Sequence, residues 1–128
     1  MNIPRPTESE LEILEVLWDN GPSTVRFVNE QLEQKGRIVA YTTTLKMMQI
    51  MSDKGLLSRE MNGRTHIYSP IIQAQVIRGA LIDRLVNSVF GGSATRMVLQ
   101  ALGNHKATAE ELQEIKKLID DIEKNRNK

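Results

Sequence analysis

The sequence predicts a mostly helical fold with one small β-hairpin, in which three helices and the hairpin are followed by three further helices. Apolar residues recur at helical spacing in six segments, and Thr-x-x-Glu capping boxes open two of them, at Thr7 and Thr108. The dipeptide Asn62-Gly63 separates two strand-like runs, which is a strong hairpin signal. Three helices followed by a hairpin is the element order of a winged helix-turn-helix.

The N-terminal half contains the winged helix-turn-helix, which we assign to residues 1–70. We expect helices from Thr7 to Asn20, from Ser23 or Thr24 to near Gly36, and from about Tyr41 to Lys54. Trp18 lies on the apolar stripe of the first helix and is predicted to belong to the core. With Asn62-Gly63 as a two-residue turn, Met61 pairs with Arg64 and Arg59 pairs with His66.

The C-terminal half, residues 71–128, is predicted to be a helical dimerisation domain. The first of its helices runs from Ile71 to about Phe90, and the second is a short one after Ser93. The third begins at Thr108 and frays from Lys124. Three such short helices leave too much apolar surface exposed to be stable alone, and a symmetric homodimer would cover it. The predicted interface residues are Ile77, Leu81, Leu85, Met97, Leu112, Ile115, Leu118, Ile119 and Ile122. Packing onto the winged domain remains the alternative.

Composition excludes several classes of protein. The chain has no cysteine and only two histidines, so we expect no disulfide, no metal site and no cofactor. The N-terminus lacks a signal-peptide pattern, and no apolar run approaches the ~20 residues of a membrane span. We therefore expect a cytoplasmic protein without membrane insertion. An enzyme is not expected either, because no nucleophile is paired with a base and no glycine loop could hold a phosphate.

Charge is unevenly distributed along the chain. Residues 1–35 carry three basic and seven acidic side chains, whereas residues 36–70 carry five basic and two acidic ones. The resulting charges of −4 and +3 place the cationic block over the third helix and the hairpin. This is a modest electrostatic footprint for nucleic acid.

The third predicted helix has two distinct faces. Thr44, Met47, Met48 and Met51 form an inner face, and Thr42, Lys46, Gln49 and Asp53 lie opposite. Amide, ammonium and hydroxyl groups near the start of such a helix suit the donor and acceptor pattern of DNA bases. We therefore predict base contacts from Thr42, Thr43, Lys46 and Gln49. A solvated polar face without a partner is the alternative.

The hairpin is predicted to contact the phosphate backbone. Alternation places Arg59, Arg64 and His66 on one face, where like charges are unfavourable unless an anion lies over them. Tyr41, at the start of the third helix, is the fourth predicted phosphate contact. The function predicted from the residues is thus sequence-specific binding of double-stranded DNA. A winged-helix protein-interaction module without DNA binding is the alternative, and the charge of residues 1–35 favours it.

The sequence resembles the penicillinase repressor (BlaI/MecI/CopY) family over nearly the whole chain. The similar segments are Trp18-Asp19, Thr24-Val25-Arg26, Tyr41-Thr42-Thr43-Thr44, Lys54-Gly55-Leu56-Leu57, Gly63-Arg64, Tyr68-Ser69-Pro70 and Phe90-Gly91-Gly92-Ser93. The resemblance implies a cytoplasmic homodimeric transcriptional repressor that binds an inverted-repeat DNA operator. Its C-terminal helices would dimerise.

The resemblance also implies possible regulators. In the antibiotic-responsive branch, a membrane sensor with a metalloprotease domain triggers cleavage of the repressor, so a sensor-protease system is an implied partner. Residues 98–101, Val-Leu-Gln-Ala, lack the Asn-Phe bond expected at that cleavage site. The copper-responsive branch carries a Cys-x-Cys tail, and a chain without cysteine cannot sense copper in that way.

Overall fold

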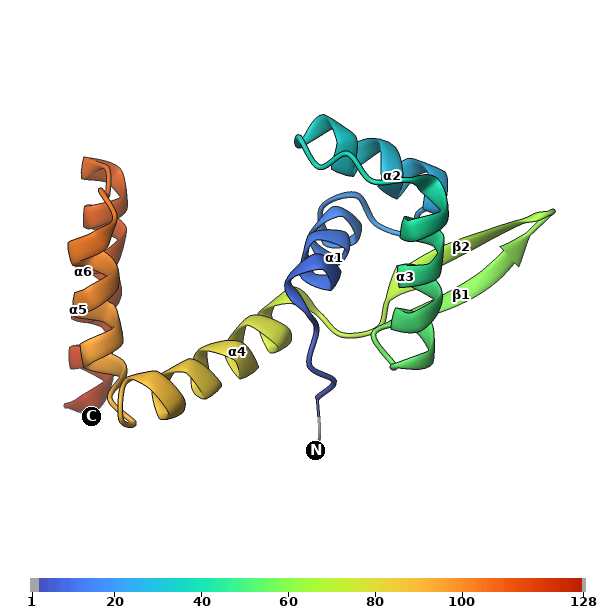
Figure 1. Ribbon diagram of the computed structural model, residues 1–128. Coiled ribbons are helices and arrows are strands. Elements are labelled where there is room, and N and C mark those ends of the chain that lie inside the picture. The colour runs from blue at the N-terminus through green and yellow to red at the C-terminus, as the bar shows by residue number, and fades with distance from the viewer. Residues whose placement is uncertain (1–2, 128) are drawn as a thin grey trace. The chain divides into compact units, whose positions relative to one another are not determined.

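The computed structural model describes residues 3–127, which form two compact units that divide between Ile82 and Asp83. The N-terminal unit begins with α1 (Glu8–Asn20), α2 (Val25–Gln34), α3 (Tyr41–Asp53), β1 (Leu57–Asn62) and β2 (Thr65–Pro70). Figure 1 shows the three helices gathered together and the hairpin projecting beyond them. The predicted winged helix-turn-helix is confirmed.

Local capping interactions explain where these helices begin and end. Thr7 and Glu10 form the predicted capping box: the Glu10 N–H donates to Thr7 Oγ1 at 3.1 Å, and the Thr7 N–H donates to Glu10 Oε1 at 2.9 Å. Thr24 caps α2 by accepting the N–H of Phe27 at 3.1 Å. Gly21 ends α1 with a φ of 82°, a conformation that suits glycine.

The core of the N-terminal unit lies where the inner faces of the three helices meet the base of the hairpin. Side chains less than 2% exposed come from every one of these elements: Ile13, Leu14, Val16 and Leu17 of α1, Val28 of α2, Met48 and Met51 of α3, Leu57 of β1 and Tyr68 of β2. The chain has few aromatic residues, and flexible methionine side chains fill the space on the α3 side.

The hairpin register in the structure differs from the predicted register, which was wrong. Asn62 pairs with Thr65, so the two turn residues are Gly63 and Arg64 rather than Asn62 and Gly63. A type I′ turn over Asn62-Gly63 requires positive φ at both residues, and only Gly63 has it, at 67°. Glycine in that conformation at the first turn position fits a type II′ turn instead.

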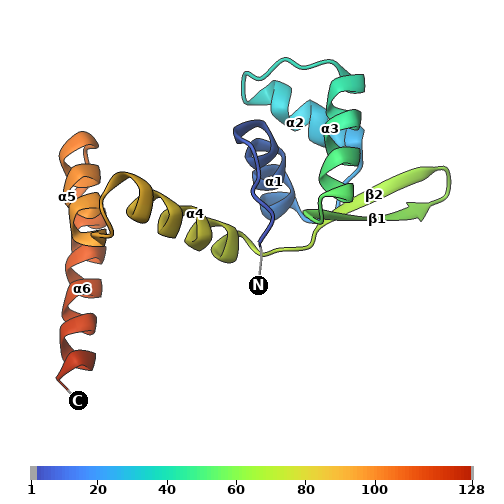
Figure 2. The same cartoon turned by 60° about the horizontal axis from the view of Figure 1, so that its bottom comes forward.

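The corrected register changes every cross-strand pair. Arg59 lies opposite Tyr68 instead of His66, and Met61 lies opposite His66 instead of Arg64. The base of β2 is fixed by a bridge to the α1–α2 connection, in which Ser23 and Tyr68 exchange backbone hydrogen bonds of 3.0 and 2.8 Å. Figure 2 shows both strands leaving the base of the helices together.

The first part of α4 (Ala74–Val89) belongs to the N-terminal core. Ile77 is only 1% exposed and joins the core, and Leu81 packs against it. Trp18 is half-buried beside these residues; its Nε1 donates to the Ile72 carbonyl at 3.1 Å, and the Arg78 guanidinium lies 5.4 Å from its ring centroid. The prediction that Ile77 lies at a dimer interface is therefore wrong, because its side chain is already covered within the chain.

The C-terminal unit holds the rest of α4 together with α5 (Ala94–Asn104) and α6 (Ala109–Arg126). Ser93 caps α5, and Thr108 opens α6 with the second predicted capping box. The last helix continues to Arg126 instead of fraying at Lys124. None of the helices in residues 3–127 is long and apolar enough to cross a membrane.

Candidate nucleic-acid interface

The outward face of α3 carries the side chains that the sequence assigned to base contacts. Thr44, Met48 and Met51 are buried against the core, as their spacing predicts. Because α3 repeats every 3.6 residues, this burial turns its opposite side to solvent. The exposed residues of that side are Thr42, Lys46, Gln49 and Asp53, with Thr43 and Ile50 on its flank, and Tyr41 is exposed at the start of the helix. Hydroxyl, ammonium and amide groups thus lie along one helix face, which has the dimensions to enter a DNA major groove.

The wing presents its cationic residues differently from the prediction. Arg59 pairs with Tyr68 and Met61 pairs with His66, so Arg59 and His66 are diagonal neighbours on one face of the hairpin. Arg64 is a turn residue at the tip and no longer lies opposite Met61. The direct like-charge pairing that the predicted register implied is absent. All three side chains remain exposed to solvent.

A cavity of about 400 Å³ lies between β2 and the first turns of α2 and α3. Its lining includes Arg26, Tyr41, Arg64 and His66, with Thr24, Val25, Leu45, Thr65 and Tyr68. The structure thus brings together three of the four predicted phosphate contacts, and Arg59 lies outside the lining. The Tyr68 hydroxyl is buried and makes no hydrogen bond to any of residues 3–127.

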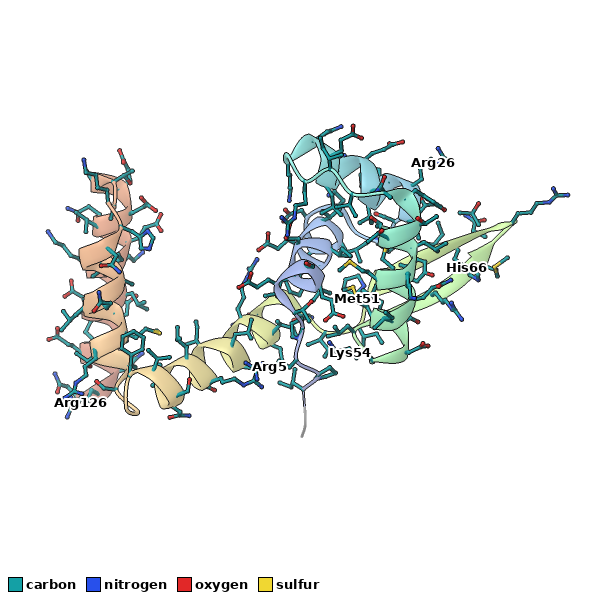
Figure 3. The ribbon with its side chains drawn as sticks, in the orientation of Figure 1. Arg5, Arg26, Met51, Lys54, His66 and Arg126 are labelled. Atoms are coloured by element: carbon teal, nitrogen blue, oxygen red, sulfur yellow. The ribbon has the colours of Figure 1, made fainter. Side chains whose placement is uncertain are left out.

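Arg26 is a cavity residue that the sequence reasoning missed. Its guanidinium carbon lies 5.8 Å from the Tyr41 ring centroid, so a cation–π contact links the first turns of α2 and α3. Figure 3 shows Arg26 and His66 on the side of the unit from which the hairpin projects. The sequence feature that could have identified Arg26 is its position two residues after the Thr24 cap, at the positive end of a helix dipole, where anions bind.

The cationic side chains of this surface have no acidic partners among the described residues. The two ion pairs within residues 3–127 join Arg37 to Glu12 and Lys54 to Glu10. Neither uses the exposed Arg26, Lys46, Arg59 or Arg64. These four charges are consequently free to interact with an external anion. Among residues 3–127, no group of three or more His, Cys, Asp or Glu side chains is placed to hold a metal ion.

A partly buried ion pair anchors the far end of α3 to α1. Lys54, which caps α3, places its Nζ 2.6 Å from Oε1 of Glu10, a carboxylate only 6% exposed. Burial alone would raise the pKa of Glu10, but the hydrogen bonds from Lys54 and from the Thr7 backbone, together with the Lys54 charge, outweigh it and hold this pKa below its usual value. The orientation of α3 is therefore fixed at its C-terminal end by the same capping box that starts α1.

The C-terminal helices carry apolar surface that is not buried within the C-terminal unit itself. No residue of α5 or α6 is buried. Of the predicted interface residues, Met97 and Ile115 are half-buried, and the exposed ones are Leu85, Leu112, Leu118, Ile119 and Ile122. Monomeric soluble proteins seldom expose so many large apolar side chains on neighbouring helical turns.

Comparison with known proteins finds one family along almost the whole chain. The family model described as "Penicillinase repressor" matches residues 6–121. The penicillinase repressor of Bacillus licheniformis is 25% identical over 126 residues, which cover 98% of this chain and 97% of that protein. The transcriptional regulator BlaI of Mycobacterium tuberculosis is 30% identical over 93 residues, covering 71% of this chain and 67% of that protein.

A solved structure matches the N-terminal part. It is the solution structure of the monomeric form of Bacillus licheniformis BlaI in complex with the blaP half-operator. The match has a TM-score of 0.50 and 27% sequence identity, and it covers 58% of this chain and 89% of that chain. The part of the fold that the two chains share is thus one that was solved together with DNA in the relative.

Proposed function

The chain belongs to the penicillinase repressor family, whose members are DNA-binding transcriptional repressors and not enzymes, and from this premise we propose how it recognises its operator. The exposed face of α3 reads bases in the major groove, and the wing with the adjacent cavity holds the phosphate backbone. The observation that carries this proposal is the combination of an exposed Thr, Lys and Gln face with four cationic side chains that have no acidic partner among residues 3–127.

Base recognition is assigned to Thr42, Thr43, Lys46 and Gln49. Lys46 can donate to O6 or N7 of guanine, and Gln49 can bond N6 and N7 of adenine at once. Thr42 and Thr43 lie in the first turn of α3, which in helix-turn-helix proteins contacts base edges. A cytoplasmic location follows from the access to DNA that this role requires.

Phosphate binding is assigned to the wing and to the cavity beside it. Arg26, Arg64 and His66 surround the cavity, and Tyr41 adds a hydroxyl group. Arg59 lies on the same face of the hairpin as His66 and extends the cationic surface along β1. Such contacts fix the register of the protein on the duplex and add affinity without reading the sequence.

The C-terminal helices are proposed to form a homodimer that places two winged domains on an inverted repeat. The exposed apolar residues of α4, α5 and α6 support this assignment, because a second copy would remove them from water. The relative from Bacillus licheniformis was solved in its monomeric form on a half-operator, which supports one half-site for each protomer. Leu85, Leu118, Ile119 and Ile122 are proposed interface residues.

Selection of bound duplexes from a random DNA library tests the proposal as a whole. The full chain should enrich an inverted repeat whose half-sites are separated by about one helical turn or a multiple of it. Enrichment of a single unrepeated half-site would contradict binding as a dimer. Recovery of no motif at all would contradict sequence-specific recognition.

Two single substitutions separate the proposed roles. Lys46→Ala should weaken binding to the selected duplex more than binding to a scrambled duplex, because it removes a base contact. Arg64→Ala should weaken both about equally and reduce the slope of log affinity against log salt by roughly one unit. The reverse pattern would place Lys46 on phosphates and Arg64 on bases.

A further inference from the structure

Asn29, in the middle of α2, joins the three segments of the helix-turn-helix through one side chain. Its Nδ2 donates to the backbone carbonyl of Val39 at 2.9 Å and to Oγ1 of Thr44 at 2.8 Å. Val39 belongs to the connection between α2 and α3, and Thr44 is a fully buried residue of α3. Val39 presents a carbonyl oxygen and Thr44 a hydroxyl oxygen, and the two N–H groups of the Asn29 amide can donate to both at once.

Apart from the cation–π contact of Tyr41 with Arg26, the first turn of α3 has few other attachments. Ala40, at its N-cap, provides no side-chain hydrogen bond. The preceding connection is largely exposed, and Ile38 within it is 84% exposed. Arg37 holds the start of the connection through its N–H bond to the Leu32 carbonyl at 2.8 Å, and through a solvent-exposed ion pair with Glu12 that contributes little. Among the described residues, the Asn29 amide is the side chain that hydrogen-bonds the backbone of this connection beyond Arg37.

We propose that Asn29 is a positioning residue for DNA recognition, an inference that rests on the proposed function. Its two hydrogen bonds set the direction of the first turn of α3 relative to α2, and thus the placement of Thr42 and Thr43. Base contacts depend on this placement to within a fraction of a hydrogen-bond length, whereas the flexible cationic side chains of the wing tolerate small shifts. Loss of the amide should therefore reduce sequence discrimination more than overall DNA affinity.

The test compares affinities for the selected operator and for a scrambled duplex of equal length, at one salt concentration and at a temperature where circular dichroism shows each variant folded. Asn29→Ala should reduce the ratio of the two affinities about tenfold, the size of the loss of one base contact. Its affinity for the scrambled duplex should stay within about threefold of wild type, because the phosphate contacts are retained. An unchanged ratio in folded Asn29→Ala would overturn the proposal.

Asn20→Ala is the matched control. The Asn20 side chain also donates one amide hydrogen bond to a backbone carbonyl, that of Val16 at 2.8 Å, but it lies at the end of α1 and its bond stays within that helix. This variant should leave the affinity ratio unchanged. A drop equal to that of Asn29→Ala would show that any lost amide bond has this effect, which would contradict a specific role for Asn29.

Changes at Thr44 test the same contact from its other side. Thr44→Val keeps the volume of the side chain and removes the oxygen that accepts from Asn29, so it should lower the affinity ratio. Thr44→Ser keeps the hydroxyl group and should retain most of the ratio. The double variant Asn29→Ala with Thr44→Val should lose less of the affinity ratio than the product of the two single fold-losses, because both changes remove the same interaction. Independent losses would contradict the proposed coupling.

Hydrogen exchange of the free protein separates failure of this inference from failure of the proposed function. Asn29→Ala should speed amide exchange in residues 39–44 and leave exchange in α1 unchanged, a readout that needs no DNA. If the wild-type chain showed no preference for any duplex, the proposed function would fail while faster exchange would still support the structural role of Asn29. Unchanged exchange in residues 39–44 would overturn that role.

Discussion

Replacing Lys54 with methionine tests whether its partly buried ion pair with Glu10 stabilises the N-terminal unit. The change removes the ammonium group and keeps a side chain of similar length, so Glu10 would stay buried and lose one charged hydrogen bond. Such a bond contributes about 1.5–3 kcal/mol, and partial exposure of Lys54 reduces the expected loss to about 1–2 kcal/mol. For a unit of this size, the midpoint of thermal unfolding should fall by about 5–15 °C.

The stability lost in Lys54→Met should depend on pH in one direction. Burial raises the pKa of Glu10. Its hydrogen bonds with Lys54 and Thr7, together with the Lys54 charge, lower this pKa by a larger amount, so the pKa in the folded state lies below that in the unfolded state. A group whose pKa is depressed on folding contributes stability that is present above its unfolded pKa and disappears as pH falls through its folded pKa. The difference between wild type and Lys54→Met should thus be complete at neutral pH and shrink below about pH 4.

Thermal denaturation of the full chain, followed by the fluorescence of Trp18, measures this effect. Trp18 is the single tryptophan of the chain and lies in the N-terminal unit, so its signal reports that unit within the intact protein. Lys46→Met is the control, because Lys46 is an exposed lysine of the same helix without an ion pair among the described residues; its effect should stay within about 0.5 kcal/mol. Equal stability of Lys54→Met and wild type at pH 7, or a difference that grows as pH falls, would refute the reasoning.

Three further changes have definite expected outcomes. Gly63→Ala places a β-carbon at a φ of 67°, and should destabilise the N-terminal unit in urea by about 1–2 kcal/mol, whereas Gly79→Ala in α4 should not destabilise it; equal effects would contradict the type II′ turn. Tyr68→Phe removes a buried hydroxyl that has no hydrogen-bond partner among the described residues, and should leave the urea midpoint unchanged or raise it; a loss above about 1 kcal/mol would show that this group is hydrogen-bonded. Ile119→Asp, on the exposed apolar surface of α6, should convert the proposed dimer to a monomer in light scattering without changing the Trp18 unfolding midpoint, and a persistent dimer would exclude α6 from the interface.

Much of the fold could be predicted from the sequence because its signals are local. The capping boxes at Thr7 and Thr108 each depend on two residues three positions apart, and both form in the structure. The inner and outer faces of α3 follow from helical spacing alone, so Thr44, Met48 and Met51 could be assigned to the core in advance. The exposed base-contact candidates were found by the same spacing.

The features that escaped prediction depend on contacts between distant segments. Asn62-Gly63 and Gly63-Arg64 are both compatible with a two-residue turn, and the choice between them is coupled to the placement of Tyr68 against Ser23 in the folded unit. Ile77 has the same sequence signature whether its apolar side packs within the chain or against a partner. The contact of Arg26 with Tyr41 joins two helices, and no periodicity within either one reveals it.

Titration of the full chain into labelled DNA tests the central claim most directly. Binding to the selected inverted repeat and to a scrambled duplex is measured at the same physiological salt concentration, because affinities at different salt cannot be compared. The account predicts that wild type prefers the inverted repeat by about a thousandfold or more, and that Lys46→Ala loses about fivefold or more of that preference. Equal affinity of the wild-type chain for both duplexes would contradict it.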